Sequence, residues 1–282
     1  MRFGFQVKID KGFEKALEYA LELGCECIQT LITSPLTWKI SGNPSGLKWY
    51  VEELRLNDIS PIAIHAPYLL NLSTPEEDVY RKSILVLSEH LEFAEEAGAD
   101  FVIVHAGSHK GAGASLGMSR LISALQKLSD FQQGRTTILV ENTPGAGGEI
   151  CSSLGEMELL LRGVEKSKRG ICLDTCHLFA FGYDLSSSVK VREFSEEVKG
   201  KIGNSVKLLH LNDCKTPLGS KVDRHESLGK GRIGLEGIKA IINDPFFKNL
   251  SAIMETPYDP IEDKYNINLA KRLRDEGNFE GG

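Results

Sequence analysis

Imidazole and carboxylate side chains stand at the ends of short apolar runs along most of this chain. The runs IAIH, FVIVH and VKLLH end at His65, His105 and His210, and the runs TILVE, GICLD and AIME end at Glu141, Asp174 and Glu255. A short apolar run predicts a buried parallel strand, and the carboxyl ends of such strands carry the chemistry of α/β folds. Several metal ions need imidazole and carboxylate ligands from many strands at one rim, so the pattern predicts a multinuclear metal site.

Two shorter motifs add further candidate ligands. In Asp174-Thr-Cys-His177 the histidine follows the strand-end aspartate where the strand is expected to turn into a loop. In Asp223-Arg-His225 the alternation directs both side chains to one side of an extended segment. The nine candidates are His65, His105, Glu141, Asp174, His177, His210, Asp223, His225 and Glu255. They suffice for three Zn²⁺ ions that share ligands, and ligand type also permits Mn²⁺ or Fe²⁺ in some positions.

Helical and strand-like periods alternate from one end of the chain to the other. Strands are predicted at residues 3–7, 25–32, 61–65, 101–105, 137–141, 170–174, 206–211 and 251–255. Helices are predicted at residues 12–23, 47–56, 76–97, 119–131, 155–163, 188–198, 235–243 and 260–274. This alternation predicts an α/β fold, a single (β/α)8 TIM-type barrel with long loops at its carboxyl-terminal face. An open doubly wound sheet is the alternative, but ligands from so many strands would not easily meet on it.

The chain is expected to form one barrel domain over residues 1–274, followed by a polar, frayed tail over residues 275–282. It has 282 residues and a net charge of −6, which argues against a broad basic nucleic-acid surface. Bound metal ions would nevertheless supply local positive charge for a phosphate substrate. The sequence lacks a long apolar run and a signal-peptide core, so we expect a cytoplasmic protein without a membrane partner.

The six cysteines show no CxxC pair, which predicts reduced, buried thiols. Cys172 and Cys176 flank Asp174, so a metal role stays open to them. Of the other histidines, we expect His90 to lie on a solvated helix face and His109 to line the pocket without binding metal.

Two loop segments allow more than one interpretation. GKGRIG, residues 229–234, has the spacing of a dinucleotide fingerprint but follows a polar loop, so no nucleotide cofactor is expected. Residues 215–232 contain five basic and two acidic side chains. The segment is either a solvated loop or a rim that contacts phosphate.

The motifs HAPY, VHAGSH, ENTPG, LDTCHLFAFGYD, HLNDCK, VDRHESLGKGRIG and METP resemble, in this order, those of the endonuclease IV family of apurinic/apyrimidinic (AP) endonucleases. The resemblance implies a TIM-type barrel with a trinuclear zinc centre that recognises abasic sites in duplex DNA. It assigns His65, His105 and Glu141 to one zinc, Glu141, Asp174, His210 and Glu255 to a second, and His177, Asp223 and His225 to a third.

The resemblance also implies DNA contacts. Tyr68, in HAPY, matches a residue with which the family penetrates DNA at the lesion, and we expect Arg224 and Lys230 to contact DNA as well. The chain departs from the family pattern at Gln6, where the family usually has histidine, and at Leu36, where a basic residue often precedes the tryptophan. Neither departure replaces a metal ligand.

The implied activity is that of a metal-dependent endodeoxyribonuclease of base excision repair. A zinc-bound hydroxide oriented by Glu141 would attack the phosphate 5′ to the abasic site, leaving a 3′-hydroxyl and a 5′-deoxyribose phosphate. We expect a monomer, because DNA must reach the open rim. The alternatives are a sugar isomerase or epimerase on the same kind of barrel, which needs only one or two metals, and a zinc or nucleic-acid binder without turnover.

Overall fold

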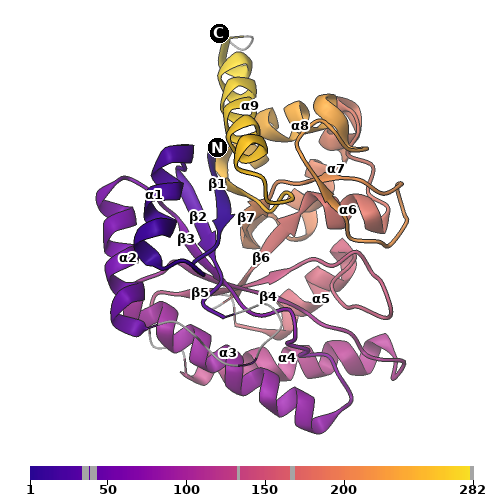
Figure 1. The fold of residues 1–282 in the computed structure, drawn as a ribbon. Helices are drawn as coiled ribbons and strands as arrows, with labels where there is room; N and C mark the ends of the chain where they lie inside the picture. The colour runs from indigo at the N-terminus through magenta and orange to yellow at the C-terminus, as the bar shows by residue number, and fades with distance from the viewer. Residues whose placement is uncertain (34–37, 39–42, 132–133, 166–168, 280–282) are drawn as a thin grey trace.

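Eight parallel strands close into a barrel in the computed structural model of the chain, which describes residues 1–33, 38, 43–131, 134–165 and 169–279 (Figure 1). The barrel strands are β1 (Arg2–Val7), β2 (Cys27–Thr30), β3 (Ile62–His65), β4 (Phe101–His105), β5 (Thr137–Glu141), β6 (Arg169–Asp174), β7 (Val206–His210) and β10 (Ser251–Met254). They pair in chain order, and β10 pairs back with β1 to close the sheet. The predicted (β/α)8 barrel is therefore confirmed.

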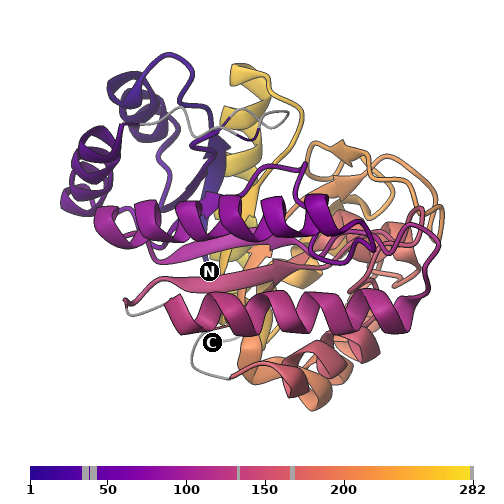
Figure 2. The same cartoon turned by 90° about the horizontal axis from the view of Figure 1, so that it is seen from below.

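Helices link successive strands and cover the outside of the barrel. They are α1 (Phe13–Leu23), α2 (Pro44–Leu56), α3 (Glu77–Ala97), α4 (Ala114–Phe131), α5 (Leu154–Gly163), α6 (Thr175–Phe181), α7 (Ser188–Lys201), α8 (Gly234–Asn243) and α9 (Pro260–Phe279), with 3-10 turns at Gly203–Ser205 and Phe247–Asn249. Figure 2 shows α3 and α4 side by side along one flank. Among the helices of the described ranges, none combines the length and the apolar character that crossing a membrane requires.

Helix ends follow local sequence signals. Ser153 begins α5 with a capping box, because its hydroxyl accepts the Glu156 N–H and the Glu156 carboxylate accepts the Ser153 N–H. Gly24 ends α1 at a φ of 75°, a left-handed conformation that a side chain disfavours. The closing helix α9 continues to Phe279, beyond the predicted end at Arg274, and residues 280–282 lie outside the described part of the chain.

The barrel interior is filled by a ring of fully buried side chains, here called the apolar ring. It consists of Cys27, Ala63, Ile103, Leu139, Cys172, Leu208 and Ile253. Gly4 completes the ring on β1, where a Cβ would lie 1.7 Å from the Cys27 carbonyl oxygen. A second, larger core lies between the strands and the surrounding helices. The barrel is therefore a packed core below its carboxyl-terminal mouth.

Candidate metal centre

Two residues beyond the apolar ring, the inward position of every strand carries a polar side chain. These residues, here called the polar ring, are Gln6, Gln29, His65, His105, Glu141, Asp174, His210 and Glu255. Side chains alternate along a strand, so positions two apart face the same way. Three pairs are direct neighbours across adjacent strands: Gln6 with Gln29, His105 with Glu141, and Asp174 with His210. The barrel thus brings six of the nine predicted ligands to one mouth.

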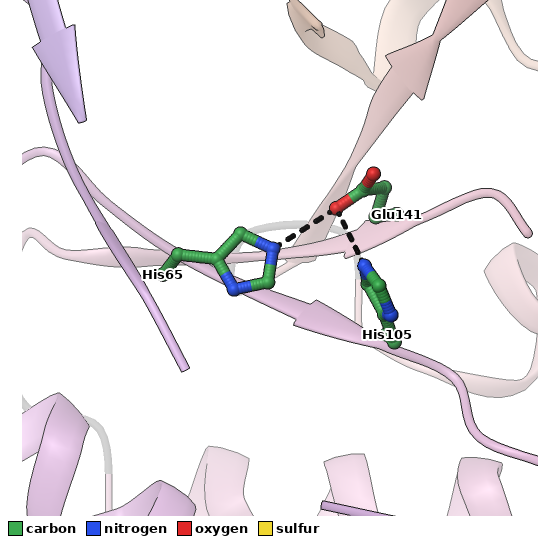
Figure 3. A group of neighbouring side chains, drawn as sticks. All are labelled: His65, His105 and Glu141. Carbon is green, nitrogen blue, oxygen red and sulfur yellow. Dashed lines mark hydrogen bonds and ion pairs between the residues drawn. The ribbon is translucent and has the colours of Figure 1, made fainter. Parts of the chain in front are cut away.

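The first group of ligand-type side chains comes from β3, β4 and β5. The Nε2 atoms of His65 and His105 lie 3.1 and 3.2 Å from the same oxygen, Oε2 of Glu141. Figure 3 shows both imidazoles directed at this oxygen. Their potential ligand atoms lie within 4.8 Å of one another, close enough to surround one cation.

The second group uses the other oxygen of Glu141. Nδ1 of His210 lies 3.2 Å from Oε1 of Glu141 and 3.2 Å from Oε2 of Glu255, and Asp174 completes the group. Glu141 is fully buried and belongs to both groups. It therefore has the geometry of a bridging carboxylate.

The third group consists of His177, Asp223 and His225. Nε2 of His177 lies 3.3 Å from Oδ2 of Asp223, and Nε2 of His225 lies 3.2 Å from Oδ1 of the same residue. The Asp223 side chain is 46% exposed. This group is consequently the one most open to solvent.

The segment that places His177 was predicted wrongly. His177 was expected in a loop, but it lies on α6, which begins directly after β6. Asp174 caps this helix, because its Oδ1 accepts the His177 N–H at 2.7 Å. The aspartate therefore both belongs to the polar ring and starts the helix that brings His177 to the site.

The extended segment predicted for Asp223-Arg-His225 is realised in part. His225 begins β9 (His225–Glu226), which pairs with β8 (Asp213–Cys214) in a short antiparallel sheet within the loop after β7. Both side chains meet at the third group, as the alternation predicted.

Four of the histidines are oriented by a hydrogen bond from one ring nitrogen. Nδ1 of His65, His177 and His225 donates to the carbonyls of Ala66, Asn142 and Glu255 at 2.6, 2.8 and 3.0 Å, and Nε2 of His210 donates to Oε1 of Gln29 at 2.8 Å. When such a ring is neutral, its other nitrogen carries a lone pair that can bind a metal ion. Metal-binding histidines are held in this way, with the free nitrogen as ligand.

Four of the atoms that face the centre lack hydrogen-bond partners. Among the described residues, Glu141 Oε1, His177 Nε2, His210 Nδ1 and His225 Nε2 are buried without such a partner. Carboxylate oxygens lie 3.2 to 3.3 Å from these three nitrogens. Buried polar atoms of this kind are costly unless something compensates them. Divalent cations would do so, and the nitrogen and oxygen donors present suit zinc, manganese or iron.

Electrostatics at the site favour bound cations. Burial raises the pKa of Glu141, but His210 and His105 outweigh it and hold the pKa well below its ordinary value. Burial likewise acts against ionisation of Asp223, yet His177 holds its pKa at about 2. Both carboxylates are therefore ionised at neutral pH. Burial acts against protonation of His177 and His210, but neighbouring carboxylates outweigh it and raise the pKa of both rings well above its ordinary value, so the mouth of the barrel attracts positive charge.

The predicted DNA contacts lie on the same face of the barrel. Tyr68 is 44% exposed, and its ring packs on those of His65 and His105 with centroids 5.2 and 5.3 Å apart. Arg224 is exposed and donates to the Asp223 carbonyl. Lys230 forms an ion pair of 2.6 Å with Glu262. Leu36 lies outside the described residues.

The two histidines expected not to bind metal, His90 and His109, differ in how deeply they are buried. His90 was predicted on a solvated helix face, which is wrong: it is fully buried on α3 and donates from Nδ1 to the Val86 carbonyl at 2.7 Å. Burial lowers its pKa to about 4, so it is neutral. His109 is partly exposed and its Nδ1 accepts the N–H groups of Gly111 and Gly113.

The GKGRIG segment wraps a carboxylate of the protein itself. The Asp213 side chain accepts backbone N–H groups from Gly229, Gly231, Ile233 and Gly234 at 2.9 to 3.4 Å. Asp213 is fully buried near the start of the loop that carries Asp223 and His225. The glycines thus serve to anchor this loop against the barrel.

The expectation of reduced, buried cysteines is confirmed, because all six are free and buried. Cys176 also lies with Asp174 and His225 in a further group of potential ligands. Its thiol is 4.0 Å from Oδ1 of Asp223, so it borders the third group.

Several residues that hold the candidate ligands in place were not predicted from the sequence. Asn142 accepts the Asp174 N–H at 2.6 Å, and Asn212 donates to Oδ2 of Asp174 at 2.7 Å while accepting the Glu255 N–H. Gln29 contacts both His210 and Glu255. Each asparagine follows a strand-end ligand by one or two residues, which was the available signal.

Comparison with known proteins agrees with this architecture. A family described as xylose isomerase-like TIM barrel matches residues 17–276. A probable endonuclease 4 from Carboxydothermus hydrogenoformans is 38% identical over 278 residues, covering 98% of this chain and 97% of its own length. The crystal structure of endonuclease IV from Thermus thermophilus is similar with a TM-score of 0.84 at 32% identity, over 98% of this chain and 100% of that chain.

A D-tagatose 3-epimerase-like protein also has a similar structure, with a TM-score of 0.72 over 98% of this chain and 99% of that chain. It is 18% identical, so the likeness extends to the fold alone. The endonuclease relatives, by contrast, are similar in sequence along almost their whole length. The chain therefore belongs to the endonuclease 4 family, within the xylose isomerase-like TIM barrels.

Proposed function

We propose that this protein is a metal-dependent endodeoxyribonuclease of base excision repair that hydrolyses the phosphodiester 5′ to abasic sites in duplex DNA. The products would be a 3′-hydroxyl and a 5′-deoxyribose phosphate. The observation that carries the proposal is the convergence of nine ligand-type side chains, several with unpartnered buried atoms, at the mouth of an endonuclease 4 family barrel.

Three groups of side chains would hold three zinc ions. His65, His105 and Glu141 would hold the first, Glu141, Asp174, His210 and Glu255 the second, and His177, Asp223 and His225 the third. When bound, zinc supplies a Lewis acid for the phosphate oxygens and lowers the pKa of a coordinated water to about 7. Nine ligands exceed what one or two ions need, which separates this site from that of a sugar isomerase.

Glu141 is the proposed catalytic residue. Its two oxygens face different groups of ligands, and its low pKa keeps it an acceptor at neutral pH. It can therefore accept a hydrogen bond from the attacking water and orient it towards the phosphate. A side-chain nucleophile is not required, since water attacks directly.

Substrate recognition would come from the rim around the centre. Tyr68 would enter the DNA beside the abasic nucleotide, and Arg224 and Lys230 would contact phosphates. Lys230 would exchange its ion pair with Glu262 for one with DNA. An abasic nucleotide lacks a stacked base, so it costs less to rotate into the site, which favours lesions over intact DNA. The open mouth suits a monomer.

Incision of a labelled duplex with one abasic analogue tests the proposal, with an intact duplex as control and magnesium absent. We expect one cut immediately 5′ to the lesion, lost after prolonged chelation and restored by zinc. Metal-loaded protein that binds the lesion without cutting would indicate a binder without turnover. Metal-loaded protein that neither binds nor cuts would contradict the proposed substrate.

A further inference from the structure

Two members of the polar ring are not ligand-type residues. Gln6 and Gln29 occupy the inward positions of β1 and β2, where the other six strands carry histidine, aspartate or glutamate. Gln29 is fully buried beside the second group of candidate ligands. An amide in such a place can orient ligands through hydrogen bonds that a carboxylate or an imidazole would not provide.

The contacts of Gln29 define the orientation of its amide. Its Nε2 donates to Oε1 of Glu255 and to Oε1 of Gln6, each at 2.6 Å, and its Oε1 accepts from Nε2 of His210 at 2.8 Å. Both hydrogens of the amide nitrogen are used. The reversed amide would place its oxygen against the Glu255 carboxylate, which is repulsive. Gln29 therefore selects the His210 tautomer whose Nδ1 faces the centre.

Gln6 continues this chain of hydrogen bonds. Its Oε1 accepts from Gln29, so its Nε2 is the atom left to donate to the neighbouring hydroxyl of Tyr68. In this arrangement the Tyr68 oxygen would accept from Gln6, and its own proton would be available to another group.

We infer that Gln6 and Gln29 form an amide relay that fixes His210 in its metal-binding tautomer and leaves the Tyr68 hydroxyl proton free to bond a substrate phosphate. Hydrogen bonds run from His210 through Gln29 to Gln6, and the Nε2 of Gln6 would extend the relay to Tyr68. Tyr68 also packs on His65 and His105, so the residue expected to probe DNA touches the first metal group and is linked to the second. The DNA part of this inference rests on the proposed function, whereas the metal part does not.

The metal part is tested without DNA, by zinc titration against a chromophoric chelator. Gln29→Leu should weaken zinc binding about 10- to 100-fold at one position, the usual effect of losing a residue that orients a metal ligand. Gln6→Met, which leaves the contacts of Gln29 to His210 and Glu255 in place, should show a much smaller change. If Gln29→Leu does not fold, Gln29→Asn, whose shorter amide does not reach His210, should show the same loss.

The DNA part is tested with a duplex whose abasic analogue carries a methylene group in place of the scissile oxygen. Gln6→Glu keeps an acceptor for Gln29 but cannot donate, so the Tyr68 hydroxyl would turn its proton towards Glu. Loss of one hydrogen bond to phosphate should weaken binding about three- to tenfold. The same change in a Tyr68→Phe background should have almost no effect, which distinguishes the relay from repulsion by the added charge.

Two results would overturn the relay. One is wild-type zinc affinity in both Gln29 variants, and the other is an equal loss of DNA affinity for Gln6→Glu with and without the Tyr68 hydroxyl. Wild-type protein that shows no preference for the abasic duplex would instead contradict the proposed function, and the zinc titration would still decide the role of Gln29.

Discussion

The apolar ring and the polar ring occupy consecutive inward positions on the same eight strands, yet they have opposite energetic characters. Each side chain of the apolar ring is buried against its neighbours and stabilises the barrel through removal of apolar surface from water. The polar ring is almost as buried, but it contains nitrogen and oxygen atoms without hydrogen bonds. Positions two residues apart on the same strands therefore have opposite effects on stability. The apolar ring stabilises the fold, whereas burial of the polar ring costs free energy that bound metal ions would offset.

The largest expected effect comes from neutralising the shared member of the polar ring. Glu141→Gln keeps the size of the side chain but removes the charge that both metal groups use. Binding of abasic DNA should persist while incision falls at least about 10²- to 10³-fold, the usual effect of losing a central electrostatic group. Single-turnover incision measures this, with Glu193→Gln on the exposed side of α7 as control. Near-normal turnover would refute the bridging role.

A substitution at Leu139, two residues before Glu141 on the same strand, should lower stability and leave the candidate ligands in place. Leu139→Ala in the apolar ring creates a cavity inside the barrel and should lower the free energy of unfolding by about 2–5 kcal/mol. The exposed Leu159→Ala on α5 is the matched control, with a change within about 0.5 kcal/mol. Urea unfolding of both variants gives the values. If Leu139→Ala were as stable as the control, the interior would not be closely packed.

His90 is a buried histidine outside the polar ring, and burial lowers its pKa. Its folded pKa is about 4, against 6.5 for the ordinary group, so between these values the unfolded chain binds more protons and stability falls as pH falls. In chelated protein, wild type should lose roughly 2–3 kcal/mol more than His90→Leu between pH 7 and pH 4.5. Parallel pH dependence of the two proteins in denaturant unfolding would contradict a neutral, buried His90.

The smallest effect is expected outside the rings. Leu36→Arg restores a basic residue near Trp38, and one added phosphate contact should raise affinity for abasic DNA severalfold and steepen its salt dependence by about one counterion. Fluorescence anisotropy at several salt concentrations measures both quantities. An unchanged dissociation constant would show that this departure from the family pattern does not weaken DNA contact.

Much of the fold and of the candidate site follows from local sequence patterns. Apolar runs separated by helical periods predicted the barrel, because a parallel strand buried on both faces has a distinctive composition. Polar residues at the ends of those runs predicted which side chains the mouth would gather. His65, His105 and Glu141 meet for this reason alone, since a closed barrel brings their strand ends together.

Other features depended on contacts between distant segments. The helix that carries His177 is too short for a periodic pattern to show, and the Asp174 cap that starts it is also a member of the polar ring. His90 lies on a helix with charged neighbours in sequence, and only the packing of α3 decides that it is buried. The glycines at 229–234 have the spacing of a dinucleotide fingerprint, and only the structure shows that their partner is Asp213, from another strand.

The sequence by itself determined the element order, the barrel and the types of side chain at the strand ends, because these depend on periodicity and on alternation within each strand. Only the tertiary structure decided which atoms face one another: the two oxygens of Glu141 between separate groups, the hydrogen-bond partners of four histidines, and the link from His210 through Gln29 to Gln6. These relations depend on register between strands and on the closure of the barrel. Neither is encoded in the spacing of residues along one strand.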